Sequence, residues 1–329
     1  MKHILNELIE HRSLSKETAR KVLIDLASGK YNASQMSAFM TVYMMRAITL
    51  EELQGFRDAM LELCIPIRFD QPVMDVCGTG GDGKNTFNIS TLSSFVVAAA
   101  GQPVAKHGNY GVSSVSGSSN VLEYFGYVFT NDHAQLERSL ERANIFFMHA
   151  PLFHPAMKNV APIRKELGVK TFFNMLGPMV NPAFPPRQLV GVFNLELARL
   201  YGYLYQNSDK QFVILHDVQG FDEISLTGSW KIFSNAGERL LEPSDLGFPE
   251  VNAADLAGGA TVEESAKIFL RILKGEGTLA QNSVVIANAG MALYCADPGA
   301  GMEDAMSRAR ESLVSGNALK SFQNLLEKN

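Results

Sequence analysis

The chain has few cysteines, a single tryptophan and no excess of positive charge. Its 329 residues include three cysteines, and 29 Lys and Arg stand against 34 Asp and Glu, which gives a net charge of −5. Cys64, Cys77 and Cys295 are too scattered for a zinc motif or a disulfide framework, so we expect them to pack as small apolar side chains. The acidic balance argues against a nucleic-acid partner, and any bound anion needs local positive charge.

Long apolar runs are also absent. No run of about 18 apolar residues occurs, so we expect no membrane partner. The first twelve residues include Lys2, Glu7, Glu10, His11 and Arg12 and contain no apolar core typical of a signal peptide, which favours a cytoplasmic protein. Because 46% of the residues are hydrophobic, the chain can bury a large core divided over two domains.

Residues 1–65 are predicted to be helical. Ser15 is a suitable N-cap before an apolar stripe with helical spacing. Ser34 is predicted to cap a second helix, and Thr49 with Glu52 predicts a capping box for a third. A small all-helical N-terminal domain is therefore expected.

After this region, short strand-like segments alternate with helical ones. The strand-like segments are residues 73–76, 103–106, 145–148, 189–193 and 212–215. Such alternation indicates an α/β domain with a mainly parallel central sheet, which we place at residues 70–329.

The most informative stretch is a glycine-rich turn that directly follows the first of these strands. Gly78, Gly80 and Gly83 satisfy G-x-G-x-x-G, but the acidic residue expected about twenty positions later in a dinucleotide site is absent. Residues 88–91 then begin a helix. A turn of this kind either merely reverses the chain or lets backbone N–H groups and a helix N-terminus bind an anion. The second interpretation predicts a phosphate or pyrophosphate site.

A second polar loop, residues 106–120, follows the next strand. It contains Lys106 and a series of serine and asparagine side chains. A solvated linker is one interpretation of such a Ser/Gly-rich segment. However, ligands of open parallel sheets bind beyond the carboxyl ends of the strands, where both loops can converge on one crevice.

These motifs closely resemble those of anthranilate phosphoribosyltransferases. The resemblance rests on residues 78–82, 88–91 and 106–109 and continues through residues 151–158, 161–168, 174–182, 188–192 and 222–225. It implies transfer of the 5-phosphoribosyl group from phosphoribosyl pyrophosphate to the amine of anthranilate, giving N-(5-phosphoribosyl)anthranilate and pyrophosphate in tryptophan biosynthesis. It also implies a homodimer formed through the N-terminal helices, a helical domain completed by residues near 155–180, and an active site in the cleft between the domains.

The resemblance assigns the phosphoribosyl pyrophosphate site to both polar loops. The residues are Gly78, Gly81, Asp82, Thr86, Asn88, Ile89, Ser90, Thr91, Lys106, His107, Gly108, Asn109, Tyr110, Gly111, Val112, Ser113, Ser114 and Ser118. The Lys106 ammonium suits pyrophosphate as a compact point charge. The structural alternatives are that Ser90 and Thr91 only cap a helix and that Lys106 is an exposed strand-end residue.

The implied cofactor is Mg²⁺, with two ions per monomer by resemblance. Magnesium takes hard oxygen ligands, typically a few carboxylates together with phosphate oxygens. Asp222 and Glu223 are the best candidate pair, and the resemblance adds the Ser90 hydroxyl. Adjacent side chains on a strand point to opposite faces, so both carboxylates can reach one ligand only from a loop, which Gly220 permits. The alternative for an Asp-Glu pair is a solvated surface turn.

Arg164 is the candidate for the anthranilate carboxylate. It lies near the start of a predicted helix at residues 161–167, where a cation opposes the macrodipole and a ligand-facing role is favoured. A guanidinium binds a carboxylate bidentately, and the resemblance adds Gly78 and Asn109 to this site. The alternative is a surface ion pair with a residue such as Glu166.

We assign neither a covalent nucleophile nor an essential base, because a neutral aryl amine attacks without prior deprotonation. It does suggest a substrate channel lined by His107, Pro151, His154 and Pro178. The chain departs from the family pattern at two places. Tyr110-Gly111 stands where many relatives have Arg and a small or hydroxyl residue, and Asn120 replaces a usual Asp.

Two other functions of the same fold stay open at this point. A pyrimidine nucleoside phosphorylase would cleave at the same ribose carbon with phosphate as the nucleophile. A nucleic-acid-binding relative would show a basic face and lack the acidic pair, whereas this chain is acidic and keeps Asp222 and Glu223.

Overall fold

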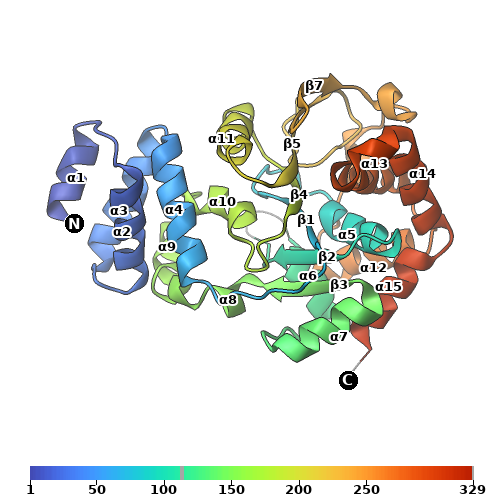
Figure 1. The fold of residues 1–329 in the computed structure, drawn as a ribbon, viewed down its shortest axis with the longest axis horizontal. Coiled ribbons are helices and arrows are strands. Elements are labelled where there is room, and N and C mark those ends of the chain that lie inside the picture. Colours follow the sequence, from blue (N-terminus) through green and yellow to red (C-terminus); the bar gives the residue numbers. More distant parts are fainter. Residues whose placement is uncertain (112–114, 328–329) are drawn as a thin grey trace. The chain divides into compact units, whose positions relative to one another are not determined.

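The computed structural model describes residues 1–111 and 115–327. The chain divides into two compact units, one of Met1–Ile67 with Ala150–Phe184 and one of Arg68–His149 with Pro185–Asn329. The first unit is helical and the second is α/β, as the ribbon shows (Figure 1). The predicted fold class is therefore confirmed.

The helical unit is built from two segments that are distant in sequence. Its elements are α1 (Lys2–Ile9), α2 (Lys16–Ala27), α3 (Ala33–Met45), α4 (Leu50–Leu63), α8 (Ala150–Phe153), η1 (Pro155–Asn159), α9 (Ala161–Leu167), α10 (Phe173–Leu176) and η2 (Gly177–Val180). Phe172 of the second segment stacks on Phe56 of α4 with ring centroids 4.5 Å apart and meets Phe39 of α3 edge-on. All three rings are fully buried, so the second segment completes the aromatic core of this unit.

Side-chain caps explain where these helices begin. Ser15 caps α2, and Thr49 and Glu52 form a reciprocal capping box at α4, as predicted. The prediction that Ser34 caps α3 is wrong. Asn32 occupies that position and accepts the backbone N–H three residues later at 2.9 Å. Since Asn caps as well as Ser and comes first in the chain, α3 begins before Ser34.

The α/β unit is built on a seven-stranded sheet in the order β3-β2-β1-β4-β5-β6-β7. The parallel strands are β1 (Met74–Gly78), β2 (Val104–Gly108), β3 (Ile145–His149), β4 (Arg187–Gly191) and β5 (Gln211–Asp217). An antiparallel hairpin of β6 (Trp230–Ser234) and β7 (Gly237–Leu241) extends the sheet. All five predicted strands exist, with ends within two residues of the prediction.

The strand order places a ligand-binding edge between β1 and β4. The chain winds from β1 to β2 and β3 on one side and continues as β4 and β5 on the other. In parallel sheets, ligands bind beyond the carboxyl ends of the strands at such a switch point. Gly78 and Gly191 are the paired last residues of β1 and β4 at this position.

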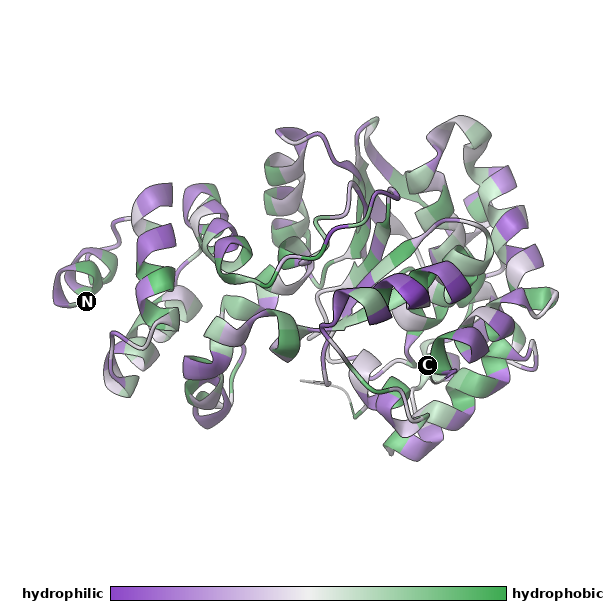
Figure 2. Ribbon diagram, turned by 60° about the horizontal axis from the view of Figure 1, so that its bottom comes forward, coloured by the Kyte–Doolittle hydropathy of each residue, from purple (hydrophilic) through white to green (hydrophobic). Residues whose placement is uncertain are grey.

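Helices cover the sheet. They are α5 (Ile89–Ala99), α6 (Ser118–Tyr124), α7 (His133–Ala143), α11 (Leu195–Gln206), α12 (Val262–Leu273), α13 (Leu279–Ala296), α14 (Gly301–Val314) and α15 (Asn317–Leu326), with short 3₁₀ turns η3 (Pro243–Leu246), η4 (Ala253–Leu256) and η5 (Pro298–Ala300). The outer helices mix hydrophilic and hydrophobic residues along their length, as Figure 2 shows. In contrast, α13 is buried along most of its length and packs on α5, β4 and β5.

Two expectations from composition can be compared with this fold. Cys64, Cys77 and Cys295 are all buried and none forms a disulfide, which agrees with packing as small apolar side chains. Among the described helices, none has both the length and the apolar composition that a membrane span needs.

Candidate active site

The glycine turn after β1 is closed by a carboxylate from a distant loop. Gly80, Gly81 and Gly83 have φ values of +66°, +78° and +74°, a region that side-chain-bearing residues rarely adopt. The Gly80 N–H donates to Asp222 Oδ2 at 2.6 Å. The turn and the loop between β5 and β6 therefore form one structure.

Two glycines allow this loop to pack directly on the sheet edge. A Cβ added at Gly78 would overlap Asp222 Oδ2, and one added at Gly191 would overlap the Asp222 carbonyl oxygen. Side chains are thus excluded at the carboxyl ends of both β1 and β4. Gly191 was not predicted as a site residue, although it lies in one of the motif blocks.

Asp222 and Glu223 lie on a loop rather than on a strand, as expected. Gly220, two residues earlier, has φ +87°. Glu223 Oε1 accepts the Ser90 backbone N–H at 3.2 Å, in the first turn of α5. The two adjacent carboxylates therefore contact different elements, one the glycine turn and the other the N-terminus of α5.

Asp222, Glu223 and Ser90 form a cluster with Lys106, which is the buried cation of this group. It lies on β2 and is 3% exposed, so the alternative of an exposed strand-end residue is wrong. Its Nζ donates to the Val76 carbonyl at 2.6 Å and to Ser90 Oγ at 3.3 Å. Its charge is directed toward the same helix terminus that Glu223 contacts.

The electrostatic balance of the cluster is negative. Burial raises the pKa of Asp222 well above its ordinary value, and the charges of Glu223 and Asp82 raise it further. Burial also raises the pKa of Glu223 to about 7, although the Lys106 ammonium opposes this shift. Because one ammonium faces three carboxyl groups, an additional cation would stabilise their ionised forms.

The oxygen atoms present suit Mg²⁺ as a partial ligand set. Asp222 and Glu223 carry hard carboxylate oxygens, and the Ser90 hydroxyl belongs to the same cluster. In residues 1–111 and 115–327, no group of three or more His, Cys, Asp and Glu side chains forms a metal site by itself. This agrees with the ordinary habit of Mg²⁺, which takes one or two carboxylates and completes its shell with phosphate oxygens and water.

The residues around the start of α5 support the turn. Asp82 Oδ1 accepts the Lys84 N–H at 3.0 Å, and Asn88 Nδ2 donates to the Ser116 carbonyl at 2.9 Å. Thr86 forms an isolated bridge with Ala257. Ile89 and Thr91 are buried, at 2% and 3% exposure, so their backbone groups are better placed than their side chains to meet a ligand.

The ends of the second polar loop are joined by hydrogen bonds between side chains and backbone groups. The Asn109 carbonyl accepts from Ser118 Oγ at 3.3 Å. Asn120 Oδ1 accepts the N–H groups of Gly111 and Gly117, both at 2.9 Å, so this replacement for Asp still closes the loop. Three predicted site residues lie outside the described residues: Val112, Ser113 and Ser114.

Tyr110 fills the position where the family pattern has a basic residue. It is 40% exposed, its ring meets His149 edge-on at 4.8 Å, and its hydroxyl donates to Glu123 at 3.4 Å. The side chain therefore contacts α6 and β3. His107 and Gly108 are half-buried on β2, next to Lys106.

Arg164 lies on α9 of the helical unit. It is half-buried, donates to Asn174 Oδ1 at 3.3 Å and lies over the Phe173 ring at 5.1 Å. Burial lowers its pKa, and no carboxylate among the described residues lies within ion-pair distance, Glu166 included. The macrodipole argument for Arg164 is wrong, because this seven-residue helix places Arg164 in its last turn as well.

The other predicted channel residues of the helical unit differ in exposure. Pro151 is exposed and Pro178 is buried. His154 is 5% exposed, its Nε2 lies 3.1 Å from the Val180 carbonyl, and burial lowers its pKa to about 4. His154 is thus a neutral core histidine in this unit.

Three residues near the cluster were missed by the sequence analysis. Lys84 Nζ lies 4.8 Å from the centroid of the Phe221 ring, and its position just after the glycine turn was an available signal. Asp217 and Asn288 hydrogen-bond the loop that carries the acidic pair. The available signal for Asn288 was one amide side chain in an otherwise apolar helical stretch.

Comparisons with known proteins agree with this geometry. Residues 70–319 match the family model described as "Glycosyl transferase family, a/b domain". Residues 2–64 match the one described as "Glycosyl transferase family, helical bundle domain".

The similar proteins have a common name. Anthranilate phosphoribosyltransferase of Christiangramia forsetii is 60% identical over 99% of this chain and 98% of its own length. That of Flavobacterium johnsoniae is 60% identical over 99% of both chains. Among solved structures, the Thermus thermophilus enzyme has a TM-score of 0.91 at 33% identity and covers 98% of both chains. The Saccharomyces cerevisiae enzyme in complex with PRPP and Mg has a TM-score of 0.89 at 26% identity, over 98% of this chain and 95% of that one.

Proposed function

The chain belongs to the anthranilate phosphoribosyltransferase family, and from that premise we propose how its own residues carry the reaction. It is a pentosyltransferase that transfers the 5-phosphoribosyl group of phosphoribosyl pyrophosphate to the amine of anthranilate. The products are N-(5-phosphoribosyl)anthranilate and pyrophosphate, and the step belongs to tryptophan biosynthesis. The observation that carries the residue assignments is the cluster of Asp222, Glu223, Ser90 and Lys106 at the carboxyl edge of the sheet.

The phosphoribosyl pyrophosphate site takes backbone donors from the glycine turn and charge from Lys106. Positive φ values at Gly80, Gly81 and Gly83 turn the backbone where an anion can approach its N–H groups. The start of α5 adds further donors, because the Asn88 side chain does not cap it, although Glu223 already accepts the Ser90 N–H. The support is the position of these groups at the switch point of the sheet.

Asp222, Glu223 and Ser90 are the residues that would hold Mg²⁺, with two ions per monomer as the proposed number. The metal, when bound, neutralises charge on the pyrophosphate leaving group. The glycines at 78 and 191 keep the acidic loop against the sheet edge. Lys106 and the N-terminus of α5 fix Ser90 and the Glu223 carboxylate.

The anthranilate carboxylate is assigned to Arg164, together with Asn109 and Gly78. The Arg164 guanidinium has N–H donors left for a carboxylate. Its described hydrogen bond goes from Nη2 to the neutral Asn174 amide, and no described carboxylate pairs with it. The amine nitrogen forms the new bond to the ribose carbon as the bond to pyrophosphate oxygen breaks. The amine proton leaves after attack, so no strong base is required of the protein.

A homodimer through the N-terminal helices is part of the proposal. Ile9 of α1 is 64% exposed, and Met44 and Met45 at the end of α3 are 44% and 81% exposed. Contiguous exposed apolar patches, rather than single side chains, mark association surfaces, so the proposal requires these residues to form one patch. Sizing of the native protein should give twice the chain mass, and replacement of Met45 by Lys should shift it toward the monomer.

A cytoplasmic location is also proposed. Its support is that none of the three cysteines forms a disulfide, as expected where thiols are kept reduced. Fractionation of cells that express the native chain would test it.

The activity is tested by mixing the protein with phosphoribosyl pyrophosphate, Mg²⁺ and anthranilate and following anthranilate fluorescence. We expect the fluorescence to fall only when all components are present. No loss under any metal condition would contradict the function. Phosphate-dependent cleavage of thymidine or uridine would favour a nucleoside phosphorylase, and tight duplex DNA binding at physiological salt would favour a nucleic-acid-binding role.

A further inference from the structure

The loop that carries the acidic pair is closed at its base by Asp217. Asp217 is the last residue of β5 and is fully buried. Its Oδ1 accepts the Gln219 N–H at 2.8 Å, and its Oδ2 accepts from Ser225 Oγ at 2.6 Å and from the Ser225 N–H at 3.2 Å. One side chain thus joins both ends of residues 217–225.

The upper part of the same loop is held by Asn288 of α13. Asn288 Oδ1 accepts the Ile224 N–H at 3.0 Å, and its Nδ2 donates to the Ile224 carbonyl at 2.8 Å. A further bond from Nδ2 reaches the Val284 carbonyl within the helix at 2.9 Å. Both backbone polar groups of the residue that follows Glu223 are therefore paired with one amide side chain.

The burial of Asn288 makes these hydrogen bonds important for the loop, because water cannot replace them. Asn288 and Ile224 are both fully buried, and the residues around Asn288 in α13 are apolar. Buried backbone groups of a loop have no strand or helix partner and need a side chain that both donates and accepts. An apolar residue at 288 would suit the apolar surroundings of α13 but would leave the Ile224 backbone groups without this partner.

The held residue is adjacent to the acidic pair. Ile224 follows Glu223, and the Asp222 backbone packs against Gly191. Asp222 and Glu223 are thereby fixed on one side by the sheet edge and on the other by α13. Side chains that orient metal-binding groups commonly change metal affinity when they are removed.

We propose that Asn288 is a positioning residue, which fixes Asp222 and Glu223 for Mg²⁺ and pyrophosphate by pairing with the Ile224 backbone. This inference rests on the metal role given to Asp222 and Glu223 above. We expect Asn288 to act through Ile224 and to contact neither substrate nor metal itself.

The test compares Asn288→Leu with Ile286→Ala in the full chain. Ile286 lies two residues earlier in α13, about 200° around the helix axis, and is 3% exposed without a side-chain hydrogen bond. Both variants lower the melting temperature. Only Asn288→Leu should raise the Mg²⁺ concentration for half-maximal activity, by ~10-fold, while the KM for anthranilate stays within about twofold.

Two further readouts do not depend on activity. Calorimetry should show ~10-fold weaker binding of Mg²⁺ with phosphoribosyl pyrophosphate to Asn288→Leu than to Ile286→Ala. Hydrogen exchange should show a protected Ile224 amide in the native protein and faster exchange in Asn288→Leu. If Asn288→Leu does not fold, Asn288→Asp replaces it, because it keeps the acceptor for the Ile224 N–H and loses the donor.

The results separate this inference from the proposed function. Equal Mg²⁺ constants in the two variants, or rapid exchange of the Ile224 amide in the native protein, would overturn the role of Asn288. Activity of the native protein without any divalent metal would instead contradict the metal role of Asp222 and Glu223.

Discussion

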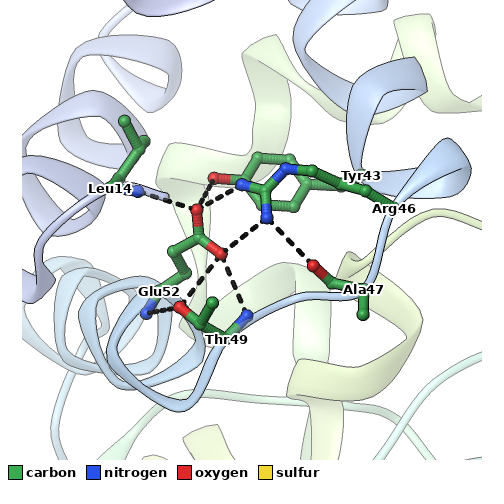
Figure 3. Close-up of polar contacts among 6 residues, drawn as sticks. All are labelled: Leu14, Tyr43, Arg46, Ala47, Thr49 and Glu52. Carbon is green, nitrogen blue, oxygen red and sulfur yellow. Dashed lines mark hydrogen bonds and ion pairs between the residues drawn. The ribbon is translucent and has the colours of Figure 1, made fainter. Parts of the chain in front are cut away.

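Two glutamates, the buried Glu52 of the helical unit and the half-buried Glu223 of the α/β unit, have opposite electrostatic surroundings. Glu52 of the helical unit is fully buried and accepts hydrogen bonds from Leu14 N and Tyr43 Oη, both at 2.9 Å (Figure 3). It also accepts the Thr49 N–H at 2.9 Å and forms an ion pair with Arg46. Burial alone would raise the pKa of Glu52, but these donors outweigh it and lower the pKa.

Glu223 of the α/β unit has a raised pKa of about 7, because burial is opposed only by Lys106 and by Ser90. Its neighbours include two further carboxyl groups, Asp222 and Asp82. The difference separates two uses of a carboxylate that is removed from much of the solvent. Glu52 is neutralised by its own unit and stabilises it, whereas the acidic pair shares the single ammonium of Lys106 with Asp82, as expected of a site that binds cations.

The largest expected effect comes from removing the negative charge of the acidic pair. Asp222→Asn with Glu223→Gln should lower kcat/KM by ~10³-fold, because groups that stabilise charge in the transition state contribute at this scale. The Mg²⁺ titration should change as well, while the melting temperature stays or rises. An unaltered Mg²⁺ titration would exclude both residues as metal ligands, and Glu223 would then not differ in function from Glu52.

The second prediction concerns the structural glutamate. Glu52→Gln leaves the Arg46 guanidinium buried without its counter-charge, which costs about 3–5 kcal/mol when a buried pair is broken. Thermal unfolding should show this loss, and the Mg²⁺ titration should stay unchanged. Glu263→Gln is the control, since its ion pair with Lys267 is solvent-exposed and should contribute nothing measurable. Equal melting temperatures for both variants would contradict the stabilising role of Glu52.

The third prediction tests whether the sheet edge holds the acidic loop. Gly191→Ala places a Cβ where the Asp222 carbonyl oxygen lies, so the loop must move. A displacement of ~1 Å should lower kcat/KM by ~10²-fold. Gly202→Ala is the matched control, because its added Cβ would meet only ordinary contacts with Phe233, beginning at 3.7 Å. Equal activity of both variants would contradict the proposed packing.

Local signals in the sequence predicted much of this arrangement. The glycine turn and the start of α5 follow β1, and Lys106 lies near the carboxyl end of β2, so periodicity and turn chemistry place them at one sheet edge. Ser34 was a wrong cap because Asn32 is equally suited and comes first. An amide in an apolar stretch marks Asn288 as unusual, but the roles of Asn288 and Asp217 could not be predicted, because they depend on hydrogen bonds to a loop whose position only the folded sheet and α13 define.

The fourth prediction compares two arginines of the helical unit, Arg46 and Arg164. Arg46 has a carboxylate partner in Glu52, whereas Arg164 donates only to the neutral Asn174 side chain. Arg164→Ala should therefore raise the KM for anthranilate by ~30-fold, equivalent to about 2 kcal/mol for a charged hydrogen bond. The KM for phosphoribosyl pyrophosphate should change little. Lys165→Ala on the same helix is the control, and equal effects on both KM values would refute the carboxylate assignment.

The smallest effect is the response of the helical unit to acid, for which Glu52 and His154 predict two separate steps. His154 is held neutral with a pKa of about 4, below its ordinary 6.5, so the unfolded chain binds its proton first. Stability should fall as the pH drops from 6.5 toward 4. The pKa of Glu52 is lowered from 4.5, so its contribution is present above that pH and is lost as the pH falls further. Thermal unfolding between pH 7 and pH 3 should lose the upper step in His154→Gln and the lower step in Glu52→Gln. A native profile that stays flat across both ranges would show that neither proton is linked to folding.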